Sequence, residues 1–393
     1  MNALLGKKVA DLKDEMIRLR REFHQCPELG FRERVTANKV AEYLRNLGLE
    51  VQTGIAETGV VGLLSGCKPG KTLLIRADMD ALPIEEANDV PYRSKNAGVM
   101  HACGHDGHMA ISLIAARILS SLSGEFSGQV KFVFQPGEEG FGGAREMIRH
   151  GVMGNPDVDA AMGLHLTNTL PIGELAVRAG PIMASMDSFS VEITGKSGHA
   201  AMPNEAVDAI LIGSHVITAL QTLISKETSP LEPLVVHVGT IHGGHAFNVV
   251  ADRVEMKGTV RATNEELQRS LPERMERIIS NLSKSLRGTG KLDYHFDYPQ
   301  VVNDERISQM VKTVAVRLLG EDHIPVMPPI MASDDIGFFL QEVGGCFFFV
   351  GSSNPEKEIT GAHHNPHFDF DEDAMVTGAE VLIGSALEYL GSP

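Results

Sequence analysis

The stretch VKFVFQPGEEG at residues 130–140 sets the fold class, because a mostly apolar run typical of a buried strand ends directly in Pro-Gly and two glutamates. Similar apolar runs occur between segments with a helical spacing of apolar residues. Near-continuous apolar strands that alternate with helices indicate a sheet covered on both faces. We therefore expect an α/β domain with a mixed, largely parallel sheet, whose other early strands are VVGLL (60–64), TLLIRA (72–77) and AAMGLHL (160–166).

The middle of the chain has a different pattern. Here FSVEITG alternates apolar and polar residues like a half-buried strand, and the segments that follow give the order β-α-β-β-α-β of a ferredoxin-like unit. After residue 300 the first pattern returns. We predict a discontinuous domain formed by residues 1–184 and 299–393, with a small domain inserted at 185–298. The expected helices include 7–25, 33–47, 106–122, 142–150, 205–226, 264–287, 303–319, 334–342 and 372–390.

Composition excludes several classes of partner. The 393 residues carry a net charge of −16, and no Lys/Arg cluster supplies the basic surface that nucleic acid requires. An acidic surface also argues against docking on anionic lipid. The N-terminal stretch lacks the apolar core of a signal peptide, and no apolar run reaches the roughly 20 residues of a membrane span. Four scattered cysteines fit a reducing compartment. We expect a cytoplasmic protein with no nucleic-acid or membrane partner.

The densest cluster of metal-binding residue types is HACGHDGH at residues 101–108, just before a predicted helix. Thiolate, imidazole and carboxylate are the ligands of zinc and related ions. Cys103 and His105, separated by one glycine, could converge on one ion. His101 and His108 are weaker candidates. The alternative is a polar loop that caps the helix through Asp106.

The glutamates of PGEEG follow a predicted strand, and ligands in open α/β sheets bind beyond the carboxyl ends of strands. Adjacent carboxylates there suit a division of labour, with Glu139 binding metal and Glu138 moving protons, or the reverse. An exposed acidic turn is the alternative for this pair. Further candidates are Asp78 and Asp80 after the strand at 72–77, His165 at the end of another strand, and the loop histidines His363, His364 and His367.

The inserted segment has its own polar loops. GKSGHAAMP at residues 195–203 contains His199, which could donate to an anion or oxyanion. Asn248 and Arg261 also lie near predicted strand ends. For each of these residues, an ordinary solvated loop is at least as good an interpretation, and for His199 it is the better one.

Together, in this order, HACGHDGH, PGEEG, GKSGHAAMP and HNPHF resemble the N-acyl-amino-acid amidohydrolases, a family within the aminoacylase and carboxypeptidase group of metallopeptidases. The resemblance spans essentially the whole chain and implies a zinc-peptidase-like catalytic domain that binds two divalent ions. It implies that Glu138 is the general base and acid, and that His199, Asn248 and Arg261 bind the substrate carboxylate or the oxyanion. The implied metal ligands are Cys103, His105, Glu139, His165 and His364.

The chain departs from the wider group at one strand end. Where the carboxypeptidases carry His-x-Asp, this chain has Asp78-Met79-Asp80, and Cys103 replaces a bridging aspartate. The ligands of the first metal are therefore the least defined, and we expect Asp80 to orient a ligand rather than bind the ion.

The resemblance implies hydrolysis of small N-acyl-L-amino acids, of the hippurate or N-acetyl type, with Zn²⁺ or Mn²⁺, or else Co²⁺ or Ni²⁺. It also implies a homodimer or homotetramer formed through the inserted domain, in which His199 acts in its own subunit or in a partner. A metal-dependent dipeptidase or carboxypeptidase and a non-catalytic metal-binding or ligand-binding protein are the alternatives.

Overall fold

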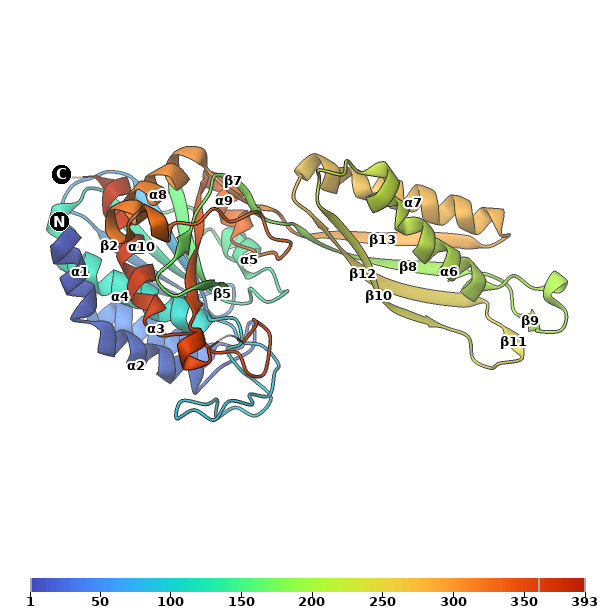
Figure 1. Cartoon of the computed structure of the whole chain (residues 1–393), viewed down its shortest axis with the longest axis horizontal. Coiled ribbons are helices and arrows are strands. Elements are labelled where there is room, and N and C mark those ends of the chain that lie inside the picture. Colours follow the sequence, from blue (N-terminus) through green and yellow to red (C-terminus); the bar gives the residue numbers. More distant parts are fainter. Residues whose placement is uncertain (1, 360, 392–393) are drawn as a thin grey trace. The chain divides into compact units, whose positions relative to one another are not determined.

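The computed structural model describes residues 2–359 and 361–391, which form two compact units. The first unit comprises residues 1–180, 302–328 and 335–393, and the second comprises 181–301 and 329–334. The segment predicted as the insert, 185–298, lies inside the second unit. Figure 1 labels many of the elements of both units, which are described separately below.

Among the described residues, the first unit holds a seven-stranded sheet in the order β1-β2-β4-β3-β5-β15-β6. The four central strands, β4, β3, β5 and β15, are parallel, and the outer strands join antiparallel. This mixed, largely parallel sheet confirms the predicted fold class. The strands are β1 (Glu50–Ile55), β2 (Gly59–Ser65), β3 (Thr72–Asp78), β4 (Gln129–Gln135), β5 (Ala160–Pro171), β6 (Leu175–Ala176) and β15 (Gly345–Ser353).

Helices cover both faces of this sheet. Successive residues of β5 point to opposite faces: Gly163 lies against Ile336, just before α9, whereas Leu164 contacts Gly378 of α10. The long apolar helix α4 is buried along most of its length between the sheet, α2 and α10. The helices are α1 (Asn2–Ala10), α2 (Lys13–His24), α3 (Arg34–Asn46), α4 (His105–Ser121), α5 (Gly143–Arg149), α8 (Glu305–Leu319), α9 (Gly337–Val343) and α10 (Ala374–Leu390), with short 3-10 turns at Ser123–Glu125, Glu321–His323 and Pro355–Lys357.

The first unit differs from the sequence prediction in two local features. The helix expected at 7–25 is two helices, α1 and α2, separated by a turn at residues 11–12. Strand β1 was not predicted, because EVQTGI is mostly polar and exposed at the edge of the sheet. Neither feature changes the order of the central strands.

The second unit contains a four-stranded antiparallel sheet in the order β10-β12-β8-β13. Helices α6 and α7 pack on it, and their apolar residues form a core separate from that of the first unit. The chain order β8-α6-β10-β12-α7-β13 is the predicted ferredoxin-like arrangement. The elements are β8 (Met186–Thr194), α6 (Ala209–Leu220), a π-helical turn (Leu223–Glu227), β10 (Leu234–Gly243), β12 (Arg253–Ala262), α7 (Glu265–Ser285) and β13 (Thr289–Tyr298).

Smaller elements complete the second unit. A two-stranded ribbon joins β9 (Gly198–His199) to β11 (Val249–Val250). Residues 209–227 are long and apolar enough, by length and composition alone, to cross a membrane, which the sequence analysis did not anticipate. One face of α6 nevertheless packs into the core of this unit. Short elements elsewhere are β7 (Gly180–Met183), a 3-10 turn (Pro203–Glu205) and β14 (Val301–Asn303).

Candidate metal centre

The carboxyl ends of the parallel strands define the location of the site. β3 ends at Asp78, which lies in register with Gln135, the last residue of β4. On the other side of β3, His165 of β5 lies in register with Phe349 of β15. Loops leave the sheet from these ends, and those after β3 and β4 carry Asp80 and the two glutamates of PGEEG. This edge is where open α/β sheets bind their ligands.

Five of the predicted ligands converge beyond these strand ends. Sγ of Cys103 lies 3.5 Å from Nε2 of His165. The ligand atoms of Cys103, His105 and His165 all lie within 4.8 Å of one another, and so do those of Cys103, Glu139 and His364. Cys103 belongs to both groups, so its sulfur is placed where two neighbouring cations could share one ligand.

Two buried polar atoms in this cluster fit a cation. Nδ1 of His105 donates to the backbone carbonyl of Asp80 at 2.8 Å, so in the neutral imidazole, the form that binds metal, Nε2 carries the free lone pair. This Nε2 and Oε1 of Glu139 have no hydrogen-bond partner among the described residues, although Oε1 lies 3.2 Å from Nε2 of His364. Unpaired buried polar atoms are costly. A divalent ion would satisfy both of these, and the imidazole, thiolate and carboxylate donors suit it.

The charge state of the cluster also depends on a cation. Burial, reinforced by the negative charge of Glu139, raises the pKa of the Cys103 thiol. Contacts with Cys103 and Glu139 raise the pKa of His364 to about 10. Without metal the protein therefore favours a thiol beside an imidazolium. A bound cation reverses this preference, because thiolate and neutral imidazole are the forms that bind metal.

Asp80 anchors the loop that carries both glutamates. Its Oδ1 accepts a hydrogen bond from the backbone N–H of Glu138, and its Oδ2 accepts one from Glu139, each at 2.9 Å. The backbone carbonyl of Asp80 also accepts the hydrogen bond from Nδ1 of His105. Asp80 therefore positions His105 and the two glutamates. The Glu138 side chain is buried, and its Oε2 lies 4.0 Å from Nε2 of His105. The loop thus presents two carboxylates to one imidazole.

The other histidines of HACGHDGH have different surroundings. Nε2 of His108 accepts the backbone N–H of Leu166 at 3.0 Å, so Nδ1 carries the proton and donates to Asp78 at 2.7 Å. Both ring nitrogens are used, which makes His108 a support for the strand ends. Burial lowers the pKa of His101 to about 3. Its ring is buried beside His24, outside the two ligand groups.

The loop that carries His364 is held in a defined conformation. His364 has a φ of 60°, which is uncommon for a residue other than glycine. Its backbone N–H donates to the carbonyl of Ala102 at 2.8 Å. The neighbouring His363 donates from Nε2 to the carbonyl of Leu166 at 3.0 Å, and its ring lies against His165. His363 thus acts as a support, and His364 carries the ring that faces Glu139.

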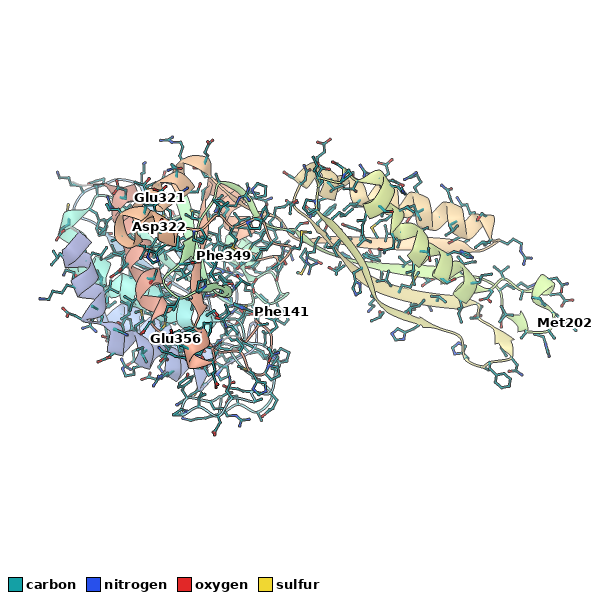
Figure 2. The ribbon with its side chains drawn as sticks, viewed as in Figure 1. Phe141, Met202, Glu321, Asp322, Phe349 and Glu356 are labelled. Carbon is teal, nitrogen blue, oxygen red and sulfur yellow. The ribbon has the colours of Figure 1, made fainter. Side chains whose placement is uncertain are left out.

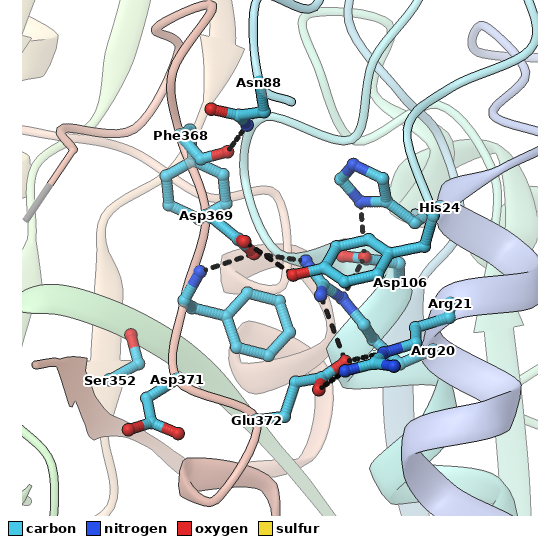
Figure 3. A network of polar contacts seen from close by, with 12 residues as sticks. Arg20, Arg21, His24, Asn88, Asp106, Ser352, Phe368, Asp369, Asp371 and Glu372 are labelled. Atoms are coloured by element: carbon cyan, nitrogen blue, oxygen red, sulfur yellow. Dashed lines mark hydrogen bonds and ion pairs between the residues drawn. The ribbon is translucent and has the colours of Figure 1, made fainter. Parts of the chain in front are cut away.

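A buried polar network that sequence reasoning missed joins α4 to the segment after His364 (Figure 3). Arg20 of α2 is fully buried and donates to Asp106 at 2.8 Å, Asp369 at 2.7 Å and Glu372 at 3.2 Å. One guanidinium therefore ties the first turn of α4, which contains His105, to residues that follow the His364 loop. The sequence carries only a weak signal for this network: Arg20 is a charged residue that lies at helical spacing from Met16, on the apolar face of the predicted helix.

The helix-cap prediction for Asp106 is wrong. No side chain caps the start of α4, which follows Gly104 in the left-handed region at φ 91°. The Asp106 carboxylate instead accepts hydrogen bonds from Arg20 and from Nδ1 of His24 at 2.8 Å. Although burial opposes it, the charge of Asp106 raises the pKa of His24. The sequence could not reveal partners more than 80 positions away.

The three predicted substrate-binding residues of the second unit lie at two ends of its sheet. His199 and Asn248 adjoin in the β9–β11 ribbon, where Val249 pairs with His199 and Ala200 donates to the carbonyl of Asn248. Met202, in the same turn, is labelled at the end of this unit in Figure 2. Arg261 lies near the far end of β12, whose 10 residues span about 30 Å at roughly 3.3 Å per residue.

Comparisons with known proteins agree with this architecture. A sequence model of the peptidase family M20/M25/M40 matches residues 74–388. The chain is 36% identical over 387 residues to hippurate hydrolase of Campylobacter jejuni, covering 98% of both, and 38% identical over 379 residues to thermostable carboxypeptidase 2 of Saccharolobus solfataricus, covering 95% of both. The crystal structure of the Bacillus subtilis YXEP protein, a dinuclear metal binding peptidase from the M20 family, matches with a TM-score of 0.85 at 30% identity, over 98% of this chain and 100% of that one.

Proposed function

Because this chain belongs to the peptidase family M20/M25/M40, whose members hydrolyse amide bonds, we propose that it is a metal-dependent amidohydrolase of small N-acyl-L-amino acids. The products would be a carboxylic acid and an amino acid. One observation carries the proposal: a single loop presents Glu138 and Glu139 to a cluster of thiol and imidazole groups. A storage or structural metal site has no use for a second carboxylate of this kind.

The ligands divide into two sets that share Cys103. His105 and His165 with Cys103 would hold one divalent ion, and Glu139 and His364 with Cys103 would hold the other. Zn²⁺ and Mn²⁺ are the first candidates, followed by Co²⁺ and Ni²⁺, because such mixed donor sets discriminate weakly among these ions. Held by these ligands, divalent ions would lower the pKa of a bound water and polarise the amide carbonyl.

Glu138 is the proposed general base and acid. Its backbone is fixed by Asp80 and its carboxylate lies near His105, outside the two shared-sulfur sets. It would take a proton from the attacking water and return it to the leaving nitrogen, which converts one amide and one water into an acid and an amine. Each such transfer contributes typically about 10²–10⁴-fold to the rate.

We further propose that His199, Asn248 and Arg261 bind the substrate carboxylate or the developing oxyanion. The chain enters and leaves the second unit beside the Arg261 end of the sheet, whereas His199 lies at the opposite end. In this role His199 would act either in its own subunit or on a second copy of the chain. His199→Ala should lower kcat/KM without loss of metal, and an inactive mixture of His199→Ala and Glu138→Gln chains would exclude action between subunits.

The second unit also offers a surface for self-association. β10 is an edge strand of the sheet, with no further strand joined to its outer side among the described residues, and such edges readily pair with another chain. Ile210, Leu211 and Ile241 nearby are each about half exposed. We propose a homodimer formed through this edge, or a tetramer built from such dimers. Light scattering of the wild type and of Ile241→Lys tests it, and a wild-type monomer at micromolar concentration would contradict it.

A substrate panel distinguishes the proposed function from its alternatives. Protein loaded separately with Zn²⁺, Mn²⁺, Co²⁺ or Ni²⁺ would be assayed on benzoylglycine, N-acetyl-amino acids and unblocked dipeptides. We expect the acylated substrates to be cleaved fastest. A preference for unblocked dipeptides would instead support a carboxypeptidase or dipeptidase. The Saccharolobus relative, a thermostable carboxypeptidase by name, is in line with this alternative. No hydrolysis with any metal would support a non-catalytic binding protein. We also propose a cytoplasmic location, a reducing compartment in which the four cysteines, all free thiols, would stay reduced.

A further inference from the structure

Three successive backbone N–H groups of the PGEEG loop donate to two carboxylates behind it. Gly137 donates to Oε1 of Glu33 at 2.9 Å, while Glu138 and Glu139 donate to the two oxygens of Asp80, also at 2.9 Å. The loop therefore turns its N–H groups toward these anchors and its own carboxylates toward the metal-ligand cluster. The proposed mechanism uses one anchor, Asp80, and leaves the other, Glu33, without a role.

Glu33 is itself fixed in place. Its side chain is fully buried, and its second oxygen, Oε2, accepts the hydroxyl of Thr58 at 2.6 Å. Although Glu33 directly precedes α3, Glu28 supplies the cap, by accepting the N–H groups of Val35 at 3.2 Å and Thr36 at 2.9 Å. The Glu33 carboxylate is therefore free of helix capping and directed at the loop.

The segment that contains Glu33 also packs against the loop. Gly137 has a φ of 60°, and a Cβ there would lie 3.1 Å from the Phe31 ring and 3.2 Å from Cβ of Phe141. These two phenylalanine rings lie edge to face, 6.0 Å apart, and Figure 2 labels Phe141. The carbonyl of Glu28 accepts the N–H of Ala81, the residue after Asp80, at 2.8 Å. Residues 28–33 thus contact Gly137, which precedes the two glutamates, and Ala81, which follows Asp80.

We propose that Glu33 is a positioning residue, which fixes Gly137 so that Glu138 and Glu139 reach the metal centre together. The expected change in kcat rests on the proposed function, whereas the expected change in metal affinity does not. Loss of the acceptor would let the backbone at Gly137 move, and both carboxylates would move with it. A displacement of about 1 Å near reacting groups can cost about 100-fold in rate.

Glu33→Ala and Glu33→Gln form the central comparison. The alanine variant should lose roughly 10- to 100-fold in kcat with a smaller change in KM. Its affinity for Zn²⁺, measured by competition with a chelating dye, should fall about 10-fold, as when other supports of metal ligands are removed. Glu33→Gln keeps an oxygen for the Gly137 N–H and should recover most of both losses. Wild-type kcat and wild-type zinc affinity in Glu33→Ala would overturn the proposal.

Asp304→Ala is the matched control for a purely structural loss. Asp304 caps α8 by accepting the N–H of Ile307 at 2.9 Å, away from the site, so this variant should lose stability and keep both kcat and zinc affinity. Equal losses in Asp304→Ala would show that the effects report stability alone, against the proposal.

Thr58→Val provides a second test if Glu33→Ala does not fold. It removes only the hydroxyl that holds Glu33, and should lower zinc affinity and kcat by at least about 3-fold; unchanged values would contradict the proposal. If the wild type cleaved nothing on the panel, the proposed function would fail. The zinc measurements on the same variants would still decide whether Glu33 positions the loop.

Discussion

Sγ of Cys103 lies 3.5 Å from Nε2 of His165, although 62 residues separate them in sequence. The contact joins the loop before α4 to the end of β5. Cys103 also groups with Glu139 and His364, so one sulfur connects the two halves of the candidate metal centre. The consequences of removing it should therefore differ from those of removing any ligand that belongs to one half.

Cys103→Ala should abolish binding of both ions, whereas His165→Ala should reduce binding only of the ion in the half that contains His165. We expect a metal content near zero in the first variant and an intermediate content in the second. Elemental analysis after desalting measures both. Cys26→Ser, which changes an exposed thiol far from the cluster in sequence, is the control and should retain full metal. Equal metal content in Cys103→Ala and wild type would remove the sulfur from the site.

Glu138→Gln should keep its metal and lose about 10²–10⁴-fold in kcat, because the amide cannot carry the proton from water to the leaving nitrogen. Its neighbour provides the contrast: Glu139→Gln should lose metal as well as activity, since Glu139, unlike Glu138, belongs to a group that shares Cys103. Parallel measurements of kcat and bound metal separate the two roles. Near-normal turnover in Glu138→Gln would exclude Glu138 as the proton carrier.

Glu33 should make the metal-free protein less stable as the pH rises. Burial, aided by the negative charge of Asp80, raises the pKa of Glu33 from 4.5 to about 7. The folded state binds the Glu33 proton more tightly than the unfolded state does. The contribution of this proton to the free energy of unfolding is therefore complete below pH 4.5 and is lost as the pH rises through 7. The shift corresponds to about 3 kcal/mol. The free energy of unfolding, measured with urea in the presence of EDTA at pH 5 to 8, should fall with pH by this amount more in the wild type than in Glu33→Gln. The same pH dependence in both proteins would contradict the prediction.

Arg20→Met should destabilise the protein by about 3–5 kcal/mol, because it removes the guanidinium that pairs with the buried carboxylate of Asp106 and with Asp369 and Glu372. Arg18 makes a comparable ion pair with Glu22 on the solvent side of the same helix. Arg18→Met should cost less than about 0.5 kcal/mol. Urea unfolding of both variants gives the comparison, and similar losses would show that the buried network adds no special stability.

Local sequence patterns predicted the fold class because buried parallel strands are continuous apolar runs. They missed β1, whose exposed edge residues are mostly polar. They also singled out the ligand candidates, since Cys103, His105 and the two glutamates occur in short clusters of metal-binding residue types. Their roles as ligands and proton carrier remain predictions.

Supporting residues were not predictable in the same way. Arg20 and Glu33 are single charged residues within or beside helices, and their partners lie 86 and 104 positions away. Apart from the helical spacing of Arg20 from Met16, nothing in the neighbouring sequence distinguishes them from solvated surface charges. Asp106 was misassigned for the same reason, because a cap is a local interaction whereas its actual partners come from α2.

The second unit interrupts the set of candidate ligands: Cys103, His105, Glu139 and His165 precede it, and His364 follows it. During synthesis the ribosome must therefore produce the whole intervening unit before the last ligand emerges. Until then a nascent chain offers an incomplete coordination sphere, which would release a captured ion easily. Stable loading with two ions is consequently confined to nascent chains that extend beyond His364, and chains truncated before this residue should be unable to retain both.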